Sequence, residues 1–369
     1  MKTKSNKDME YMRLALQLAA KATDKTSPNP MVGAVILKDG KIIGRGYHRK
    51  AGEDHAEIMA IKDAAGRSSG AEMFVTLEPC SNYGKTPPCV PVIIESGIKK
   101  VNIAMRDPNP VNAGRGIKSL RAAGISVKVG LCGDGARGLN RKYIKYITTG
   151  YPYVTVKLAQ SLDGKIAARD GSSKWITSSG SRTRAKKMRS FFDAVVVGAN
   201  TVCEDDPLLL NWKGAPYRTR RVVVDSSLRM PFDSNLIKSA GKSPVIIATT
   251  DRAQGSLVKK FSKVKGVEIF VVRSKNKKVN LRAFLKKLGR NDIANVLVEG
   301  GGELVGSFID EGLVDEWMFF IAPKILGGAA SSVKGSGVAN IRKAIDLRDV
   351  EFEKSGRDIM VRGFTCSRV

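Results

Sequence analysis

MFVTLEPCSNYGKTPPC, residues 73–89, runs from a strand-like stretch into a proline-rich loop and holds two of the five cysteines of the chain. The triplet His55-Ala56-Glu57 lies upstream of it. A lone H-x-E triplet is a weak signal because it is common, but the ordered combination with Cys80 and Cys89 is far more specific. No rival ligand cluster is evident, since the chain has only two histidines and its other cysteines are isolated.

This layout predicts a catalytic zinc site with one zinc per chain. His55, Cys80 and Cys89 supply three ligands and leave the fourth tetrahedral position for water, whereas a structural site would close it. The same order of His, Glu and two Cys is found in zinc deaminases, where zinc activates water and Glu moves protons, so we expect Glu57 to be the acid and base. Helices starting near His55 and Cys89 would place both ligands at positive helix N-termini, which favour thiolate.

The residues around these motifs predict an α/β domain with a central sheet covered by helices on both sides. Residues 9–21 have helical periodicity, and residues 31–48 read as a hairpin turned at Lys38-Asp39-Gly40. Helices and strands then alternate. The expected helices are 55–65, 89–96 and 116–123, and the expected strands are 73–77, 100–105 and 125–129.

A second domain follows a junction near residues 146–158, where Gly150 and Pro152 separate a helical stretch from a new strand. We predict domains at 1–148 and 149–369. The second half restarts the alternation with short, β-branched apolar runs, which are typical of strands buried on both faces. These runs are YVTVKLA, AVVVG, RVVVD, VIIAT, VEIFVV, NVLVEGG and EWMFFIA.

Composition indicates a globular enzyme and argues against several other classes. The chain has 369 residues, with 42% hydrophobic and 27% charged, and no apolar run long enough to span a membrane. The start lacks the apolar core of a signal peptide, so we expect a cytoplasmic protein without disulfides. The net charge of +28 divides into +12 for residues 1–150 and +16 for the rest. This spread favours a basic surface that suits anionic small molecules over nucleic-acid binding.

The cysteine loop resembles one particular family. Eight residues separate Cys80 and Cys89, where cytidine and tRNA deaminases have two. This loop, with SPNPMVGAV (27–35), MRDPNP (105–110) and AGRGI (113–117), is similar to the bifunctional deaminase/reductase of riboflavin biosynthesis. The resemblance implies a cytidine-deaminase-like three-layer domain and a phosphorylated pyrimidine substrate, 2,5-diamino-6-(5-phosphoribosylamino)pyrimidin-4(3H)-one. It implies substrate contacts at Asn29, His48, Asn82 and Lys85, although Asn82 stands where the family usually has His.

The second half resembles the reductase domain of that family, an α/β domain similar to dihydrofolate reductase. The resemblance rests on KLAQSLDGKIA (157–167), SSKWIT (172–177), GANTVCEDDP (198–207), VDS (224–226) and VEGGG (298–302). It implies that NADPH donates hydride to the ribose C1′ and opens the ring to a ribityl chain. The implied NADPH contacts are Ala159, Trp175, Thr201, Asp205, Ser226, Gly301, Gly302, Glu303, Leu304, Val305 and Gly306. The implied substrate contacts are Lys157, Ser173, Arg189, Leu209 and Glu299.

Two features of the second half bear on this resemblance. The strand NVLVE runs into three glycines and an apolar helix, a turn that brings main-chain N–H groups to a dinucleotide phosphate, although a tight connection would read the same way. Trp212 stands where the family has a phosphate-binding Arg, and an indole cannot replace a guanidinium. We hypothesise that the adjacent Lys213 compensates.

Two other functions remain open from the sequence. A nucleic-acid base deaminase is favoured by the charge and opposed by the long cysteine loop and the second half. A zinc-stabilised binding protein with an inactive reductase domain would keep its metal and show no turnover. The family also implies a homo-oligomer that assembles through the reductase half.

Overall fold

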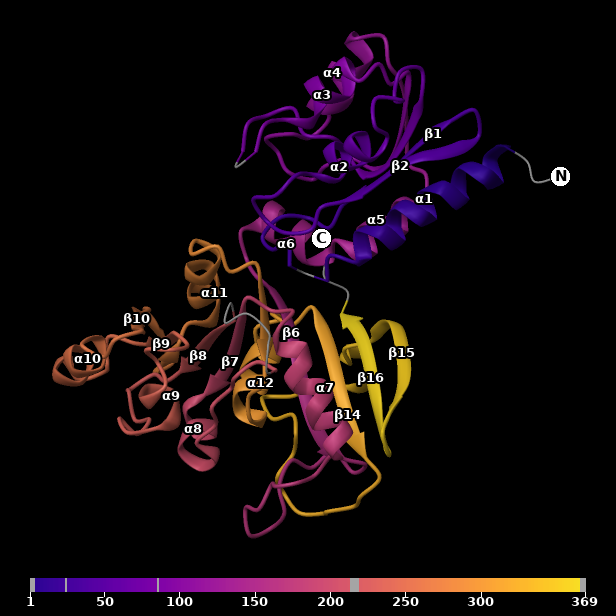
Figure 1. Cartoon of the computed structure of the whole chain (residues 1–369). Coiled ribbons are helices and arrows are strands. Elements are labelled where there is room, and N and C mark those ends of the chain that lie inside the picture. Colours follow the sequence, from indigo (N-terminus) through magenta and orange to yellow (C-terminus); the bar gives the residue numbers. More distant parts are fainter. Residues whose placement is uncertain (1–3, 24, 85, 213–218, 366–369) are drawn as a thin grey trace. The chain divides into compact units, whose positions relative to one another are not determined.

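The computed structural model describes residues 4–23, 25–84, 86–212 and 219–365. The chain divides into two compact units, Met1–Gly150 and Tyr151–Val369, and each has its own sheet (Figure 1). Within the described ranges, no helix combines the length and the apolar character that crossing a membrane requires.

The first unit is built on a five-stranded sheet in the order β2-β1-β3-β4-β5. β1 is antiparallel to both of its neighbours, and β3, β4 and β5 are parallel. The strands are β1 (Gly33–Lys38), β2 (Lys41–Tyr47), β3 (Glu72–Leu77), β4 (Lys100–Met105) and β5 (Ser126–Val129). The helices are α1 (Lys4–Ala20), α2 (Ala56–Asp63), α3 (Cys89–Glu95), α4 (Arg115–Ala122), α5 (Gly133–Leu139) and α6 (Arg141–Thr149).

Two glycines let helices approach opposite faces of this sheet. A Cβ on Gly33 would lie 2.0 Å from the carbonyl oxygen of Ala15 in α1, and one on Gly46 would lie 2.3 Å from that of Ala56 in α2. Gly46 pairs with Ala34, the neighbour of Gly33, so the two glycines face opposite sides. Any side chain at position 46 would push away the start of α2, which is where the predicted zinc ligand His55 lies.

The second unit has a nine-stranded sheet in the order β10-β9-β8-β7-β13-β6-β14-β16-β15. The first seven of these strands are parallel, and β16 and β15 add an antiparallel hairpin at one edge. The strands are β6 (Tyr153–Ser161), β7 (Ala194–Gly198), β8 (Arg220–Val224), β9 (Val245–Thr249), β10 (Val267–Val271), β13 (Asn295–Val298), β14 (Glu316–Ala322), β15 (Leu347–Ser355) and β16 (Asp358–Thr365).

Helices cover both faces of this sheet, which explains why its central strands are apolar without alternation. In β7, Ala194 and Val196 pack in one core with residues of α11 and α12, whereas Val195 and Val197 pack in a second core with residues of α8, α9 and α10. The helices are α7 (Ser179–Arg189), α8 (Ala199–Asp205), α9 (Asn235–Lys238), α10 (Gly255–Ser262), α11 (Leu281–Gly289) and α12 (Gly302–Asp310). A small separate hairpin joins β11 (Ser274–Lys275) to β12 (Lys278–Val279), and a 3-10 turn spans Ile341–Lys343.

The C-terminal hairpin of β15 and β16, drawn in yellow in Figure 1, is not among the elements predicted from the sequence. β15 is an edge strand that is exposed along most of its length, and its sequence LRDVEFEKS is correspondingly polar. A search for buried apolar runs therefore does not find it.

Candidate functional site

The three predicted zinc ligands converge in the first unit. His55 is the N-cap of α2, Cys89 is the first residue of α3, and Cys80 lies in the loop after β3. His55 Nδ1 lies 3.5 Å from Cys80 Sγ and 3.3 Å from Cys89 Sγ. Donor atoms bound to one tetrahedral zinc at 2.0–2.3 Å lie about 3.5 Å apart, so this donor set fits zinc. The ligand atoms of His55, Cys80 and Cys89 all lie within 4.8 Å of one another.

Thr86 orients the imidazole of His55. Its Oγ1 lies 3.1 Å from Nε2, the nitrogen that faces away from the two sulfurs. With Nδ1 as the metal-binding nitrogen, Nε2 carries the proton and donates a hydrogen bond to Thr86 Oγ1, which holds the plane of the ring. Sequence alone does not identify Thr86, because only the folded loop brings it to His55.

Glu57 lies in the first turn of α2 and is only 3% exposed. Burial, with a further effect of the negative charge on Cys80, raises the pKa of Glu57 to about 7. A carboxyl group with such a pKa takes up and releases protons near neutral pH, as an acid and base must. The hydrogen bond with Cys89, followed by the bond to His55, lowers the pKa of the Cys80 thiol to about 4, which favours the thiolate that a metal binds.

Two of the residues expected to contact the deaminase substrate meet beside this cluster. His48 Nδ1 donates to the carbonyl oxygen of Asp54 at 3.1 Å, so Nε2 accepts from the side-chain amide of Asn29 at 3.3 Å. Burial lowers the pKa of His48, which favours this neutral form. Its ring centroid lies 5.1 Å from that of His55. From its sequence position alone, His48 could be a histidine without a functional role at the end of a strand. The structure instead places it next to the predicted metal ligand His55.

The other two expected contacts lie in the cysteine loop. The side-chain amide of Asn82 donates to the carbonyl oxygen of Val111 at 2.6 Å, so Asn82 links its loop to the one after β4. Lys85 lies outside the described residues.

Glu78, which follows β3, has a role that the sequence analysis did not assign. Its buried carboxylate accepts main-chain N–H groups from Asp107 at 3.1 Å, Gly114 at 3.0 Å and Ile117 at 3.2 Å. The last of these lies in the first turn of α4, where a negative charge is favourable. Glu78 thereby ties the strand before Cys80 to the segments MRDPNP and AGRGI.

The second unit brings three predicted substrate residues together around a buried carboxylate. Glu299, just after β13, lies 2.8 Å from Lys157 Nζ and receives two bonds from Arg189, at 2.6 and 3.0 Å. Burial would raise the pKa of Glu299, but the charges of Arg189 and Lys157 outweigh burial and hold it well below its usual range. The site therefore contains two cations and one anion, which leaves a net positive charge for a phosphorylated substrate.

Of the remaining predicted substrate residues, Leu209 lies next to this group, and Ser173 contacts a predicted cofactor residue. Arg189 Nη1 also donates to the carbonyl oxygen of Leu210 at 3.2 Å, next to Leu209, whose φ of 50° is in the left-handed region. Ser173 Oγ donates to Asp205 at 3.5 Å. Trp212 is 42% exposed, and Lys187 Nζ lies 5.3 Å from the centre of its ring. Lys213 lies outside the described residues.

The glycine turn has the form expected of a phosphate site. Gly301 is the N-cap of α12. The first hydrogen bonds of the helix are donated by the N–H groups of Leu304 and Val305 to the carbonyl oxygen of Gly301. The N–H groups of Gly302 and Glu303 therefore lie before the first helical hydrogen bond. A Cβ on Gly302 would lie 2.7 Å from the carbonyl oxygen of Ser331, so only glycine fits there. A Cβ on Gly301 would lie 3.8 Å from Thr201 Oγ1 in α8, which places Thr201 beside the turn. This helix N-terminus fits an NADPH phosphate.

The other predicted cofactor residues are spread around the second unit. Ala159 lies in β6. Ser226 Oγ accepts from the Val279 N–H at 3.1 Å. Trp175 is 62% exposed, with the Arg182 guanidinium 4.3 Å from its ring centre. The side chain of Val305 is fully buried in the core, and Gly306 follows it in α12, so these two contribute helix structure.

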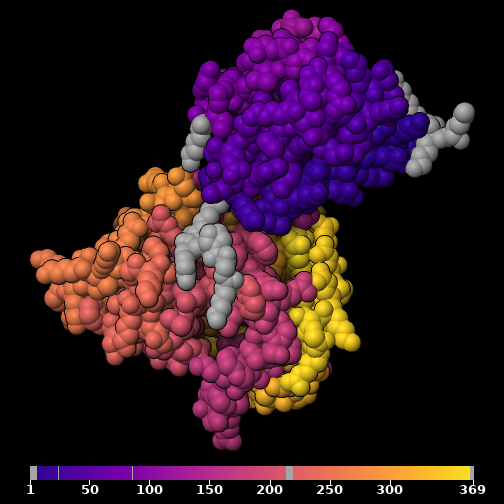
Figure 2. Space-filling model, viewed as in Figure 1, coloured from indigo at the N-terminus to yellow at the C-terminus, as the bar shows by residue number. Residues whose placement is uncertain are grey.

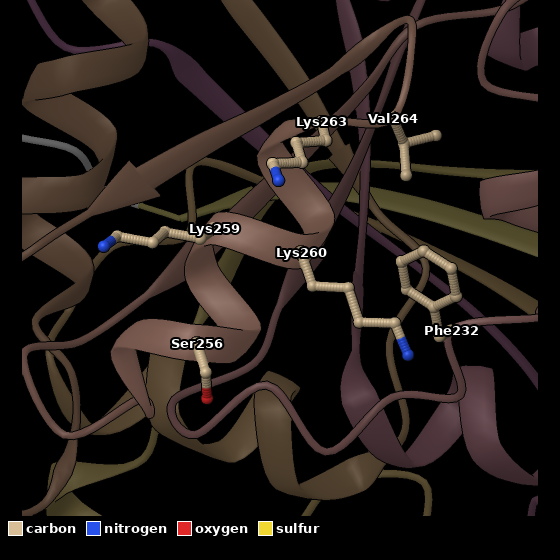
Figure 3. Close-up of a pocket in the computed structure, with 6 residues that line it drawn as sticks. All are labelled: Phe232, Ser256, Lys259, Lys260, Lys263 and Val264. Carbon is tan, nitrogen blue, oxygen red and sulfur yellow. The ribbon is translucent and has the colours of Figure 1, made fainter.

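A cavity of about 610 Å³ lies elsewhere on the second unit, against α10 (Figure 3). It is lined by Phe232, Ser256, Lys259, Lys260, Lys263 and Val264, none of which is a predicted site residue. The sheet end that carries β9 and α10 projects from the second unit in the space-filling view (Figure 2). Lysines in the last turn of α10 complement the helix dipole, which accounts for their presence without a ligand.

Comparisons with known proteins cover nearly the whole chain. Residues 5–105 match the family model described as the cytidine and deoxycytidylate deaminase zinc-binding region. Residues 152–361 match the model described as the RibD C-terminal domain. Each match therefore falls within one of the two compact units.

Several relatives are similar over their full length. The riboflavin biosynthesis protein RibD of Aquifex aeolicus is 42% identical, with 96% of this chain and 97% of the relative covered. That of Escherichia coli is 36% identical, with 95% and 98% covered. The crystal form 1 of Acinetobacter baumannii RibD has a TM-score of 0.86 at 33% identity and covers 99% of this chain and 100% of its own. A Thermotoga maritima diaminohydroxyphosphoribosylaminopyrimidine deaminase/5-amino-6-(5-phosphoribosylamino)uracil reductase has a TM-score of 0.84 at 34% identity, with 99% and 100% covered.

Proposed function

The chain belongs to the RibD family of riboflavin biosynthesis, and on that basis we propose which of its residues carry out each reaction. It is a bifunctional enzyme that acts on a small molecule, with a zinc-binding deaminase domain and an NADPH-dependent reductase domain. The predictions of fold class, activity and cofactors are thus confirmed. A nucleic-acid base deaminase is not favoured, because the RibD C-terminal domain accounts for residues 152–361.

In the deaminase, His55, Cys80 and Cys89 would hold zinc, whose Lewis acidity would make water a nucleophile at neutral pH. Glu57 takes the proton of the attacking water and delivers protons to the ring nitrogen and the departing ammonia, so that an amino group is exchanged for a carbonyl oxygen. Asn29 and His48 hydrogen-bond the pyrimidine, and Asn82 and Lys85 complete the site. The substrate is 2,5-diamino-6-(5-phosphoribosylamino)pyrimidin-4(3H)-one.

In the reductase, bound NADPH would supply the hydride that reduces C1′ of the ribosyl group of 5-amino-6-(5-phosphoribosylamino)uracil. Lys157, Arg189 and Glu299 hold the sugar phosphate together with Ser173 and Leu209. The N-terminus of α12 holds a cofactor phosphate beside Thr201. The protein's part is to position the two reactants and to balance charge around them.

One observation carries the deaminase assignment: three donor atoms at zinc-site spacing lie beside a buried carboxyl group whose pKa is about 7. The test is to incubate purified enzyme with the diaminopyrimidine substrate, with and without NADPH. Ammonia release without NADPH, followed by NADPH oxidation once it is added, is expected. An enzyme with bound zinc and no ammonia release would contradict the assignment and favour a zinc-stabilised binding protein.

The enzyme also assembles as a homo-oligomer through its reductase domain. Among the described strands, β15 lies at one edge of the sheet (Figure 1). It exposes Val350 and 72% of Phe352. An exposed apolar edge strand is a template for association with another chain. Light scattering should show a multimer for the wild type and a monomer for Phe352→Lys. A wild-type monomer at micromolar concentration would contradict this.

We place the enzyme in the cytoplasm, where Cys80 and Cys89 stay reduced.

A further inference from the structure

Asn140 joins two distant parts of the deaminase domain. It lies between α5 and α6, is the N-cap of α6, and is 2% exposed. Its Oδ1 accepts from the Met31 N–H at 2.8 Å, and its Nδ2 donates to the Met31 carbonyl oxygen at 3.0 Å. One side chain thus satisfies both main-chain groups of a residue 109 positions away.

The segment held by Asn140 leads directly to the substrate side of the site. Met31 comes two residues after Asn29, and the next residue, Val32, accepts the main-chain N–H of His48 at 2.9 Å. Asn29 and His48 then contact each other through their side chains. The position of Met31 therefore sets where Asn29 and His48 lie relative to His55.

Tyr143, one helical turn further along in α6, leads to the metal side. Its hydroxyl donates to Asp107 Oδ1 at 2.9 Å, and Asp107 Oδ2 accepts from Asn112 Nδ2 at 3.2 Å. Asn112 Oδ1 in turn accepts the main-chain N–H and the hydroxyl of Ser81, both at 3.0 Å. Ser81 is the residue after Cys80, and the side chains of Tyr143, Asp107 and Asn112 are all buried.

We propose that Asn140 and Tyr143 are positioning residues of the deaminase site, with Asn140 fixing the substrate side and Tyr143 the metal side. The proposal rests on the deaminase function assigned above. Neither residue touches the substrate, since each acts through a chain of hydrogen bonds. The two chains end at different groups, so the two substitutions have different effects. Loss of Asn140 weakens substrate binding, and loss of the Tyr143 hydroxyl weakens zinc retention.

The first test uses Asn140→Ala and Asn140→Asp in the full-length, zinc-loaded enzyme. The alanine variant is expected to raise the deaminase KM by roughly tenfold, which corresponds to about 1.4 kcal/mol, with one zinc still bound per chain. Asp keeps the acceptor for the Met31 N–H but places a carboxylate oxygen against the Met31 carbonyl oxygen, so its KM should rise at least as much as that of the alanine variant. It also provides a second variant of nearly wild-type shape if alanine prevents folding.

Asn102→Ala is the matched control for Asn140. Asn102 is equally buried and donates at 2.6 Å to Glu72 at the start of β3, away from the end of the strand that leads to Cys80. The Asn102→Ala substitution should lower the free energy of unfolding and leave the deaminase KM unchanged. An equal rise in KM for both variants, or no rise for Asn140→Ala, would overturn the role of Asn140.

The second test measures zinc transfer from the full-length enzyme to a chromogenic chelator. Tyr143→Phe should lose zinc faster than the wild type, with an affinity lower by up to about tenfold, the low end of the effect of a direct partner, and keep its KM when saturated with zinc. Tyr11→Phe is the control, because its hydroxyl donates at 3.4 Å to the carbonyl oxygen of the hairpin residue Gly40 and takes no part in the bonds that lead to Ser81. Unchanged zinc retention in Tyr143→Phe would overturn its role. Absence of ammonia release from the wild type would instead contradict the proposed function, and the chelator test would still decide the role of Tyr143.

Discussion

His55 Nε2 and Thr86 Oγ1 lie 3.1 Å apart, and this contact leaves Nδ1 of the same ring facing Cys80 and Cys89. Thr86 thus holds the ring in the orientation that presents Nδ1 to the two sulfurs. Such partners of a metal ligand typically change metal affinity strongly when they are removed.

Thr86→Val, which keeps the shape and removes the hydroxyl, should lower zinc affinity by about 10–100-fold. Thr86→Ser should restore most of it, because the hydroxyl returns. Competition with a chelator measures both affinities. Equal affinities for the valine and serine variants would exclude a role for this hydrogen bond.

Glu57→Gln should abolish ammonia release while NADPH oxidation with the deaminated intermediate persists. Glutamine cannot shuttle protons, and the loss of an acid and base typically costs about 10²–10⁴ in rate. Metal analysis provides the control, since zinc should stay bound at one per chain. Loss of both activities would argue against independent domains.

Glu299→Gln should destabilise the reductase domain, because Lys157 and Arg189 lose their buried counter-charge. Breaking such a pair costs about 3–5 kcal/mol. Trp175, Trp212 and Trp317, the three tryptophans of the chain, all lie in the second unit, so their fluorescence in urea follows that unit alone. Glu268→Gln is the control, because its 3.5 Å pair with Arg220 is exposed.

The effect of Glu299 should also depend on pH in a defined direction. Its pKa is lowered by folding, so its stabilisation is fully present above the pKa of the unfolded chain, about 4.5. That stabilisation is lost as the pH falls through the lower pKa of the folded protein. The difference in unfolding free energy between wild type and Glu299→Gln should therefore be constant from pH 8 to 6 and shrink below pH 4.5. A difference that grows on acidification would refute the ion pair as its cause.

Trp212 stands where the family has a phosphate-binding arginine, so we expect another cation to bind the substrate phosphate in this chain. Lys213→Ala should raise the reductase KM if Lys213 compensates, and an unchanged value would remove it from the site. Lys187 is a second cation next to the Trp212 ring, so Lys187→Ala should be measured in parallel.

The metal ligands could be predicted from sequence because local order encodes them. His55 and Cys89 lie at the starts of helices, and Cys80 follows a strand. The hydrophobic periodicity of these short segments predicts the helices and the strand, and with them the placement of the three ligands. Glu299, Lys157 and Arg189 were expected from family resemblance, but their mutual ion pairs depend on how β6, β13 and α7 meet, which no local pattern specifies.

Other features depend on contacts between distant residues and could not be predicted. Thr86 reaches His55 only through the fold of the cysteine loop, and Asn140 reaches Met31 across 109 positions. The C-terminal hairpin was missed because an exposed edge strand carries charged residues in place of an apolar run. For Thr86 and Asn140 the deciding interaction is tertiary, and local sequence says little about it.

Removal of zinc from the full-length enzyme tests the central claim most directly. After chelation, ammonia release should cease while NADPH oxidation with the deaminated intermediate continues, and one zinc per chain should restore the first activity. Ammonia release that survives with no metal bound would contradict the account.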